Sequence, residues 1–171
     1  ETNEKGLDKS RRIVEFYPYG TTSFNVVEDD GITLEFDADT NSRDYGGRVT
    51  TEFTSVVKGD VATLTAGKSS GTYDGYESKR HSTFVVNVTK KPTSLSAKNG
   101  SENLALVEVD SYEAFEAAAA NNQAVWFYDE APNLNKYSAD DEAFKDVAIT
   151  TSPKVYVSFT KTDVNKNAQT L

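Results

Sequence analysis

The fold class is decided by the stretch FNVVEDDGITLEF, residues 24–36. In its second half, apolar Ile32, Leu34 and Phe36 alternate with polar residues, which is the period of a strand with one buried face. The Asp30-Gly31 pair between the two halves suits the positive φ values of a tight hairpin turn. The stretch therefore predicts two antiparallel strands joined by a turn.

The same alternation recurs in short runs along the rest of the chain. Residues 124–128 are apolar on both faces, which predicts a central strand covered on both sides, with Trp126 in the core rather than on a binding surface. About nine strands at this spacing predict an all-β fold of antiparallel sheets, a sandwich or a barrel. The further strands are expected at residues 13–17, 49–57, 61–65, 84–88, 104–109 and 155–159, with a hairpin connection at residues 58–60.

Only two segments have the pattern of a helix, so one or two short helical insertions are expected. The first begins at an N-cap at Asp110, with Glu113 three residues on, and continues through the alanine-rich residues 114–120. The second is a shorter turn over residues 138–144. Neither segment gives the regular strand and helix alternation of a parallel α/β fold.

The chain has 171 residues, which is enough for one domain and short for two. Residues 1–10 are polar and without pattern, and we interpret them as a linker or tag remnant. Residues 11–171 are then a single domain. A boundary in the loop expected at residues 96–101 is the alternative, but the strands after it would form a sheet too small to stand alone. Because the chain begins with Glu rather than Met, we expect an excised segment or a processed product.

Charge and composition exclude several functions. The chain carries 18 basic and 27 acidic residues, a net charge of −9, whereas nucleic acid and anionic lipid require a clustered basic surface. The doublets Arg11-Arg12 and Lys90-Lys91 are expected at solvated ends of strands. The absence of cysteine excludes thiol catalysis, disulfides and Cys-based zinc sites. No run approaches the roughly 18 apolar residues of a membrane span.

The catalytic inventory is small. His81 is the only histidine, and no Gly-x-Ser-x-Gly elbow is present to partner it. We expect a solvent-exposed histidine at a strand end rather than a general base. Two carboxylates at a suitable separation can hydrolyse a glycosidic bond, but nothing in the sequence singles out a pair. No enzymatic activity is expected of this segment.

A weak metal pattern lies after the predicted hairpin. Asp37, Asp39 and Asn41 have the spacing that opens a calcium loop, and Asp44 is close by. Positions six and twelve of that pattern carry Ser and Arg instead of Gly and Glu. We therefore expect no cofactor and interpret the acids as a solvated loop, with a non-standard calcium site as the alternative.

A glycine-rich aromatic loop is the clearest candidate binding surface. Tyr73, Asp74 and Tyr76 lie within residues 71–76, and Tyr45 is a further candidate. Tyrosine rings stack on sugar rings, an aspartate accepts hydroxyl protons, and loops on a rigid sandwich are common binding surfaces. The alternative is that these rings only pack against the protein and leave their hydroxyls in water.

Four motifs carry a family resemblance, which is clearest over residues 11–90. The motifs Pro18-Tyr19-Gly20, Ser23-Phe24, Glu28-Asp29-Asp30-Gly31 and Gly71-x-Tyr73-x-Gly75 resemble the distal C-terminal module of family 31 glycoside hydrolases. The resemblance implies an antiparallel β-sandwich that follows the catalytic barrel of a secreted or cell-surface bacterial α-glycosidase. The catalytic aspartates of that family belong to the barrel, so the resemblance gives no residue here a catalytic role.

Two functions follow from this resemblance. The first is a structural accessory module that docks on other domains of the parent enzyme. The second is a carbohydrate-binding module that recognises α-linked sugars through the aromatic loop. Expected partners are therefore the parent's domains or an α-linked carbohydrate, with no nucleic acid and no membrane.

Overall fold

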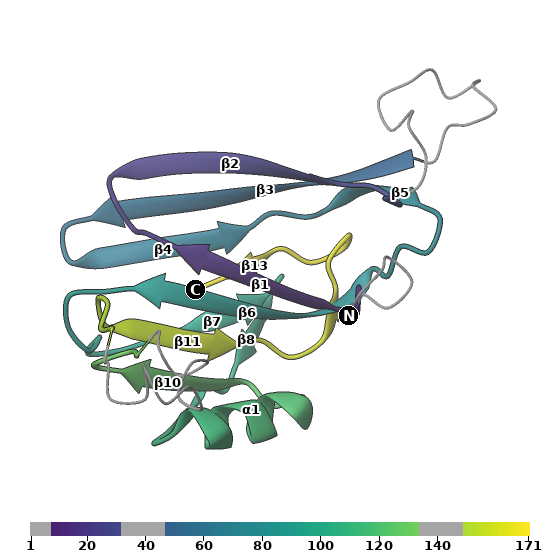
Figure 1. The fold of residues 1–171 in the computed structure, drawn as a ribbon. Coiled ribbons are helices and arrows are strands. Elements are labelled where there is room, and N and C mark those ends of the chain that lie inside the picture. The colour runs from purple at the N-terminus through teal and green to yellow at the C-terminus, as the bar shows by residue number, and fades with distance from the viewer. Residues whose placement is uncertain (1–7, 32–46, 134–148) are drawn as a thin grey trace.

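Two β-sheets pack face to face in the computed structural model (Figure 1), which describes residues 8–31, 47–133 and 149–171. The six-stranded sheet has the order β1-β6-β11-β10-β9, with β12 pairing β6. The seven-stranded sheet has the order β2-β3-β4-β13-β7-β8, with β5 pairing β3. Most pairs are antiparallel; β1–β6 and β9–β10 are parallel. The predicted all-β sandwich is therefore confirmed.

The elements have the following bounds. The six-stranded sheet contains β1 (Arg11–Phe16), β6 (Lys79–Asn87), β9 (Val107–Val109), β10 (Val125–Asp129), β11 (Lys154–Ser158) and β12 (Thr162–Asp163). The seven-stranded sheet contains β2 (Thr21–Glu28), β3 (Gly47–Lys58), β4 (Val61–Ala66), β5 (Ser70–Tyr73), β7 (Ala97–Asn99), β8 (Glu102–Leu104) and β13 (Gln169–Thr170). Helix α1 spans Tyr112–Ala120.

The main core lies between the sheets and is rich in phenylalanine. Alternate residues of each strand point inward, so Phe16 of β1 meets Phe84 of β6 at a ring distance of 4.9 Å. Phe84 also contacts Phe159 at 4.7 Å, and both are fully buried. Phe53 reaches this cluster from β3. Burial of each large apolar side chain contributes roughly 1.5–3 kcal/mol, so this aromatic row holds the two sheets together.

Strand β10 is covered on both faces, as its sequence predicts. On one face Trp126 packs against the main core. On the other, Val125 lies under α1 with Phe115 and Ala119. The N-cap of α1 is Ser111, one residue later than predicted, because the Ser111 Oγ accepts the hydrogen bond from the Ala114 N–H at 3.1 Å. The helical turn expected at residues 138–144 lies outside the described residues.

The chain bends after β2 at Gly31, and the hairpin turn expected there stays a prediction. Gly31 has a φ of 67°, and its N–H donates to Asp29 Oδ1 at 2.9 Å. The strand expected at residues 32–36 lies outside the described residues. Strand β2 pairs along its whole length with β3, from Thr21 opposite Val56 to Glu28 opposite Val49. The hairpin predicted at residues 58–60 joins β3 to β4.

The expectation of a loop at residues 96–101 is wrong. These residues contain β7 and the turn into β8, which pair as a hairpin. Gly100 supplies the positive φ of 58° that this tight turn requires. Strands from both halves of the chain share each sheet, since β13 lies between β4 and β7, and β11 lies beside β6. In the described ranges, no helix combines the length and apolar character needed to cross a bilayer.

One glycine of the motif Gly71-x-Tyr73-x-Gly75 is required by the pairing of β5 with β3. Gly71 has a φ of 103°, and an added Cβ would lie 2.1 Å from the Arg48 carbonyl oxygen. Gly75 also has a positive φ, 78°, but an added Cβ would meet nothing within 4 Å. Both glycines therefore share the cost of a positive φ, whereas the steric clash of an added Cβ applies to Gly71 and not to Gly75.

We expect Gly71→Ala to destabilise the domain more than Gly75→Ala. A left-handed backbone costs roughly 1–2 kcal/mol in a residue with a Cβ, and this cost applies to both variants. Gly71→Ala must in addition push β5 away from β3. Urea unfolding of the two variants measures the difference, and equal losses would contradict the close approach seen here.

Candidate functional site

The sandwich is open along the edge where β1 and β2 lie. Phe24 occupies an inward position of β2 and pairs with Phe53 of β3. Phe53 is only 7% exposed, whereas Phe24 is 70% exposed, because no strand of the described residues covers it from the opposite sheet. Between the strands lies an apolar cleft of about 280 Å³. Its lining residues are 14–17 of β1 and the turn after it, 22–24 and 26 of β2, and 53–55 of β3.

Further exposed aromatic side chains belong to this edge, and Tyr17 is one of those that line the cleft. Tyr17 and Tyr19, in the connection from β1 to β2, are 69% and 84% exposed. Inside the cleft, Ser55 Oγ is buried and has no hydrogen-bond partner among the residues whose structure is described. We call this cleft, with Tyr17, Phe24 and the nearby connection residue Tyr19, the open edge. It combines exposed apolar area with one unsatisfied hydroxyl, and these features are typical of an interaction surface.

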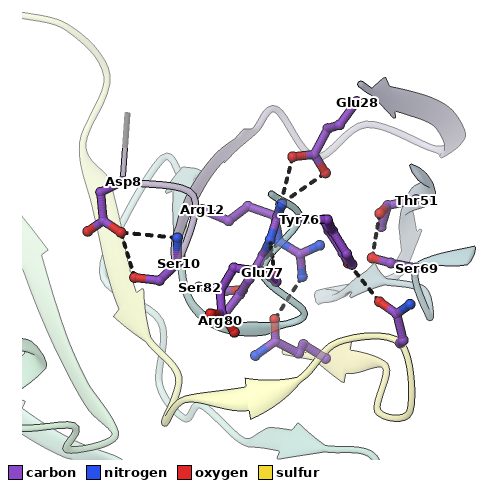
Figure 2. A network of polar contacts seen from close by, with 12 residues as sticks. Asp8, Ser10, Arg12, Glu28, Thr51, Ser69, Tyr76, Glu77, Arg80 and Ser82 are labelled. Atoms are coloured by element: carbon purple, nitrogen blue, oxygen red, sulfur yellow. Dashed lines mark hydrogen bonds and ion pairs between the residues drawn. The ribbon is translucent and has the colours of Figure 1, made fainter. Parts of the chain in front are cut away.

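At one end of the same two strands the interior becomes polar (Figure 2). Glu28, four residues beyond Phe24, forms a bidentate ion pair with Arg80 of β6, with Nη1 at 2.7 and 2.9 Å from the two carboxylate oxygens. The Arg80 side chain is 3% exposed and that of Glu28 is 29% exposed. Arg80 Nε also donates to the Glu77 carbonyl at 2.8 Å. This buried pair ties the two sheets together.

Arg12 belongs to the same polar cluster, so the expectation of a solvated arginine there is wrong. Its Nε donates to Ser82 Oγ at 3.3 Å, and its Nη2 donates to Gln169 Oε1 at 2.9 Å. Its guanidinium also lies 5.3 Å from the ring of Phe53. Burial, together with the charge of Arg80, lowers the pKa of Arg12 to about 10. Arg12 therefore remains cationic at neutral pH.

The predicted sugar-binding tyrosines lie on the other side of this cluster. Tyr73 is 6% exposed, and its ring packs 5.2 Å from that of Tyr76. Tyr76 is half-buried; its hydroxyl donates to Asn165 Oδ1 at 2.6 Å, and Arg80 lies 4.8 Å from its ring. Burial raises the pKa of Tyr76. Asp74 alone of these three is exposed. Both rings are thus used in packing, and sugar binding at this loop stays a prediction.

The remaining candidate residues lie outside the described residues. These are Tyr45 and the acidic positions Asp37, Asp39, Asn41 and Asp44. Within the described ranges, no three His, Cys, Asp or Glu side chains are grouped so that they could hold a metal ion. The calcium alternative therefore stays a prediction.

The expectation of a solvent-exposed histidine at position 81 is wrong. It is half-buried on the outer face of β6, and its Nε2 lies 2.8 Å from Ser158 Oγ. Ser158 is completely buried, so this pair cannot present a nucleophile to a substrate. Burial lowers the pKa of His81, and the charges of Arg11 and Lys161 lower it further. The histidine is therefore neutral in the folded protein at neutral pH.

A second, broader hollow of about 1080 Å³ lies on the outer face of the six-stranded sheet, beside α1. Lys154 crosses its floor and pairs with Glu15, while Lys154 Nζ also lies 3.0 Å from Asn87 Oδ1. The hydrogen bond from Lys154 lowers the pKa of Glu15, with a smaller contribution from Asn87. The Lys154–Glu15 pair is thus internally neutralised, while Ile13, Val85 and Phe115 give the hollow apolar walls.

Comparison with solved structures identifies this fold in two larger proteins. One is the GH31 dextranase FjDex31A of Flavobacterium johnsoniae, with a TM-score of 0.56 and 20% identity; the match covers 95% of this chain and 17% of that one. The other is the α-1,4-glucan lyase of Gracilariopsis lemaneiformis, with a TM-score of 0.50 and 16% identity; it covers 95% of this chain and 13% of that one. The chain thus spans under a fifth of each match.

The family 31 resemblance is therefore confirmed at the level of the fold. The sandwich corresponds to a small part of a GH31 enzyme chain. No protein-family model matches the sequence, and no curated protein matches it either.

We expect Glu28→Gln to destabilise the domain by about 3 kcal/mol, because Arg80 would remain buried without its counter-charge. Glu108→Gln is the matched control: Glu108 pairs with Lys91 in an exposed ion pair, and such pairs contribute about 0–1 kcal/mol. Urea unfolding of both variants gives the comparison. Equal losses would show that the Glu28–Arg80 pair is not a buried structural contact.

The pKa of His81 predicts a pH dependence of stability. Because the folded state lowers this pKa, the unfolded chain binds a proton more readily once the pH falls below the ordinary value of about 6.5. The free energy of unfolding should therefore fall as the pH drops from about 7 toward 5, by at most about 1.4 kcal/mol per pH unit. His81→Gln should remove this slope. As the chain has one histidine, an unchanged slope in the variant would refute the assignment.

Proposed function

We propose that this domain is a non-catalytic accessory module of a family 31 α-glycosidase, and that it docks on a neighbouring domain of the parent enzyme through the open edge. The fold supports the first part, since the matched region makes up 17% of the dextranase chain. Catalysis would then belong to the part of the parent that this chain does not span.

The observation that carries the docking role is the exposure of Phe24. This side chain points toward the core side of its sheet, yet 70% of it is exposed to solvent. Covering a side chain of this size contributes roughly 1.5–3 kcal/mol. A contacting domain would also be able to satisfy Ser55 Oγ, which has no partner in the cleft. The exposed ring and the unsatisfied hydroxyl both cost free energy in an isolated domain, and an interface that covered them would remove both costs.

Carbohydrate binding by the aromatic loop is the alternative function. Its candidate surface is the exposed Asp74 beside the half-buried Tyr76, because Tyr73 is held in the interior. For the parent enzyme we propose secretion or display at a bacterial cell surface, which is supported by the family resemblance and by the match to a dextranase of Flavobacterium johnsoniae.

We expect Phe24→Ser to act differently in the isolated domain and in the parent enzyme. In the isolated domain the side chain is already in water, so the free energy of unfolding should change by less than about 0.5 kcal/mol. In the parent, the substitution should expose the amides of β2 to hydrogen exchange and lower the melting temperature. Val61→Ser is the matched control, since Val61 is 65% exposed and lies away from the cleft.

The docking proposal fails if β2 exchanges equally fast in the isolated domain and in the parent enzyme. Titration of the isolated domain with α-glucans and small α-linked sugars tests the alternative. Saturable binding that is lost in Asp74→Ala and Tyr76→Ala would establish a carbohydrate-binding module instead.

A further inference from the structure

Within residues 8–31, 47–133 and 149–171, the polar end of the interior holds more positive charge than its one ion pair neutralises. Arg12 and Arg80 both occupy inward positions, on the neighbouring strands β1 and β6. Arg12 lies opposite Ser82 in the parallel register, and Arg80 lies two residues before Ser82, so all three side chains point to the same face. Figure 2 shows both arginine side chains in one cluster with Glu28 and Tyr76.

Each guanidinium has one nitrogen without a partner. Arg12 Nη1 and Arg80 Nη2 are both buried and form no hydrogen bond with any residue in the described part of the chain. Their remaining nitrogens are used by Ser82 and Gln169 for Arg12, and by Glu77 and Glu28 for Arg80. Buried donors are nearly always satisfied in folded proteins. Two orphan donors in one charged cluster therefore point to a missing acceptor.

The charge balance identifies the kind of acceptor. Among the described residues, Glu28 is the one carboxylate that pairs with either arginine, so two cations face a single anion. A water molecule would satisfy the two N–H groups but would leave the excess charge uncompensated. A buried charge without a counter-charge is strongly unfavourable, and an anion would supply both the acceptor and the charge.

Burial limits the size of that anion. The side chain of Arg80 is 3% exposed, and Phe53 and Tyr76 lie against the two guanidinium groups. A carboxylate carried on a partner's side chain would have to open the sandwich to reach the orphan nitrogens. A small free ion needs no such opening. We propose that Arg12 and Arg80 form a binding site for a small monovalent anion such as chloride, which stabilises the polar end of the sandwich.

The proposal does not depend on the docking function, and it is tested on the isolated 171-residue chain. Unfolding is measured at increasing sodium chloride, with the ionic strength held constant by sodium gluconate, whose anion is too large for the site. One ion bound to the folded state alone lowers the unfolding equilibrium constant tenfold for each tenfold rise in chloride above the dissociation constant. We expect this dependence in the wild-type chain.

Arg12→Gln should abolish the chloride dependence, because it removes one guanidinium and leaves Arg80 neutralised by Glu28. The matched control is Arg11→Gln, which removes an equal charge from the exposed neighbouring position and should retain the dependence. A wild-type chain that responds equally to chloride and gluconate would overturn the proposal. A chloride response that Arg12→Gln leaves unchanged would also overturn it.

A second measurement keeps the proposal falsifiable even if Arg12→Gln fails to fold. Crystals of the wild-type chain grown in sodium bromide should show an anomalous peak in contact with both guanidinium groups. Bromide found only at surface positions would identify an adventitious ion only and would overturn the proposal.

Discussion

The inner face of β6 changes from polar to apolar along its length, and the rest of the sandwich is arranged to match this change. Arg80 and Ser82 come first, and the buried Phe84 and Val86 follow. Because side chains alternate strictly along a strand, register alone fixes which neighbours meet each of these residues. In the parallel pairing with β1, Val14 lies opposite Phe84 and Arg12 opposite Ser82. One strand thus sets both the aromatic core and the charged end.

The same constraint shapes the opposite sheet. The inward positions of β2 end at Glu28, which meets Arg80 across the interior, and Phe24 lies on the same face four residues earlier. At about 3.4 Å per residue, these two residues are roughly 14 Å apart along the strand. The ion pair therefore fixes one end of an edge strand whose other end is exposed. Exposed apolar area on an ordered strand is more useful for binding than on a flexible one, because less conformational entropy is lost on contact.

Periodicity was sufficient to predict most of the sandwich. Alternation located β1, β3, β4, β6 and β11, and the apolar run at residues 124–128 correctly indicated a strand covered on both faces. Partner choice was not predictable, since the pairing of β1 with β6 joins residues 70 positions apart, such as Arg12 and Ser82. No local signal encodes such a contact. The hairpin of β7 and β8 was missed because its strands are short and its residues are mostly polar and rich in turn formers.

The charged residues of the site were the hardest to predict, for a physical reason. Arginine is almost never fully buried unless it is paired, so the residue type alone predicts a solvated Arg12 and does not single out the Lys79-Arg80 doublet. The available signal was positional: Arg80, Ser82, Phe84 and Val86 lie at every second residue, and three of these four are small or apolar. A charged residue in phase with an apolar strand face indicates a buried cation whose partner must lie on another strand.

Tyr73 is the converse case. A glycine-rich loop suggests an exposed ring, yet Gly71 lies close against β3, and this contact draws the following residues inward. In both cases the tertiary pairing, rather than the residue type, decides which groups remain available to a partner. The same holds at the open edge: Phe24 lies in phase with the core residues of its sheet, but it stays exposed because no described strand of the opposite sheet packs over it.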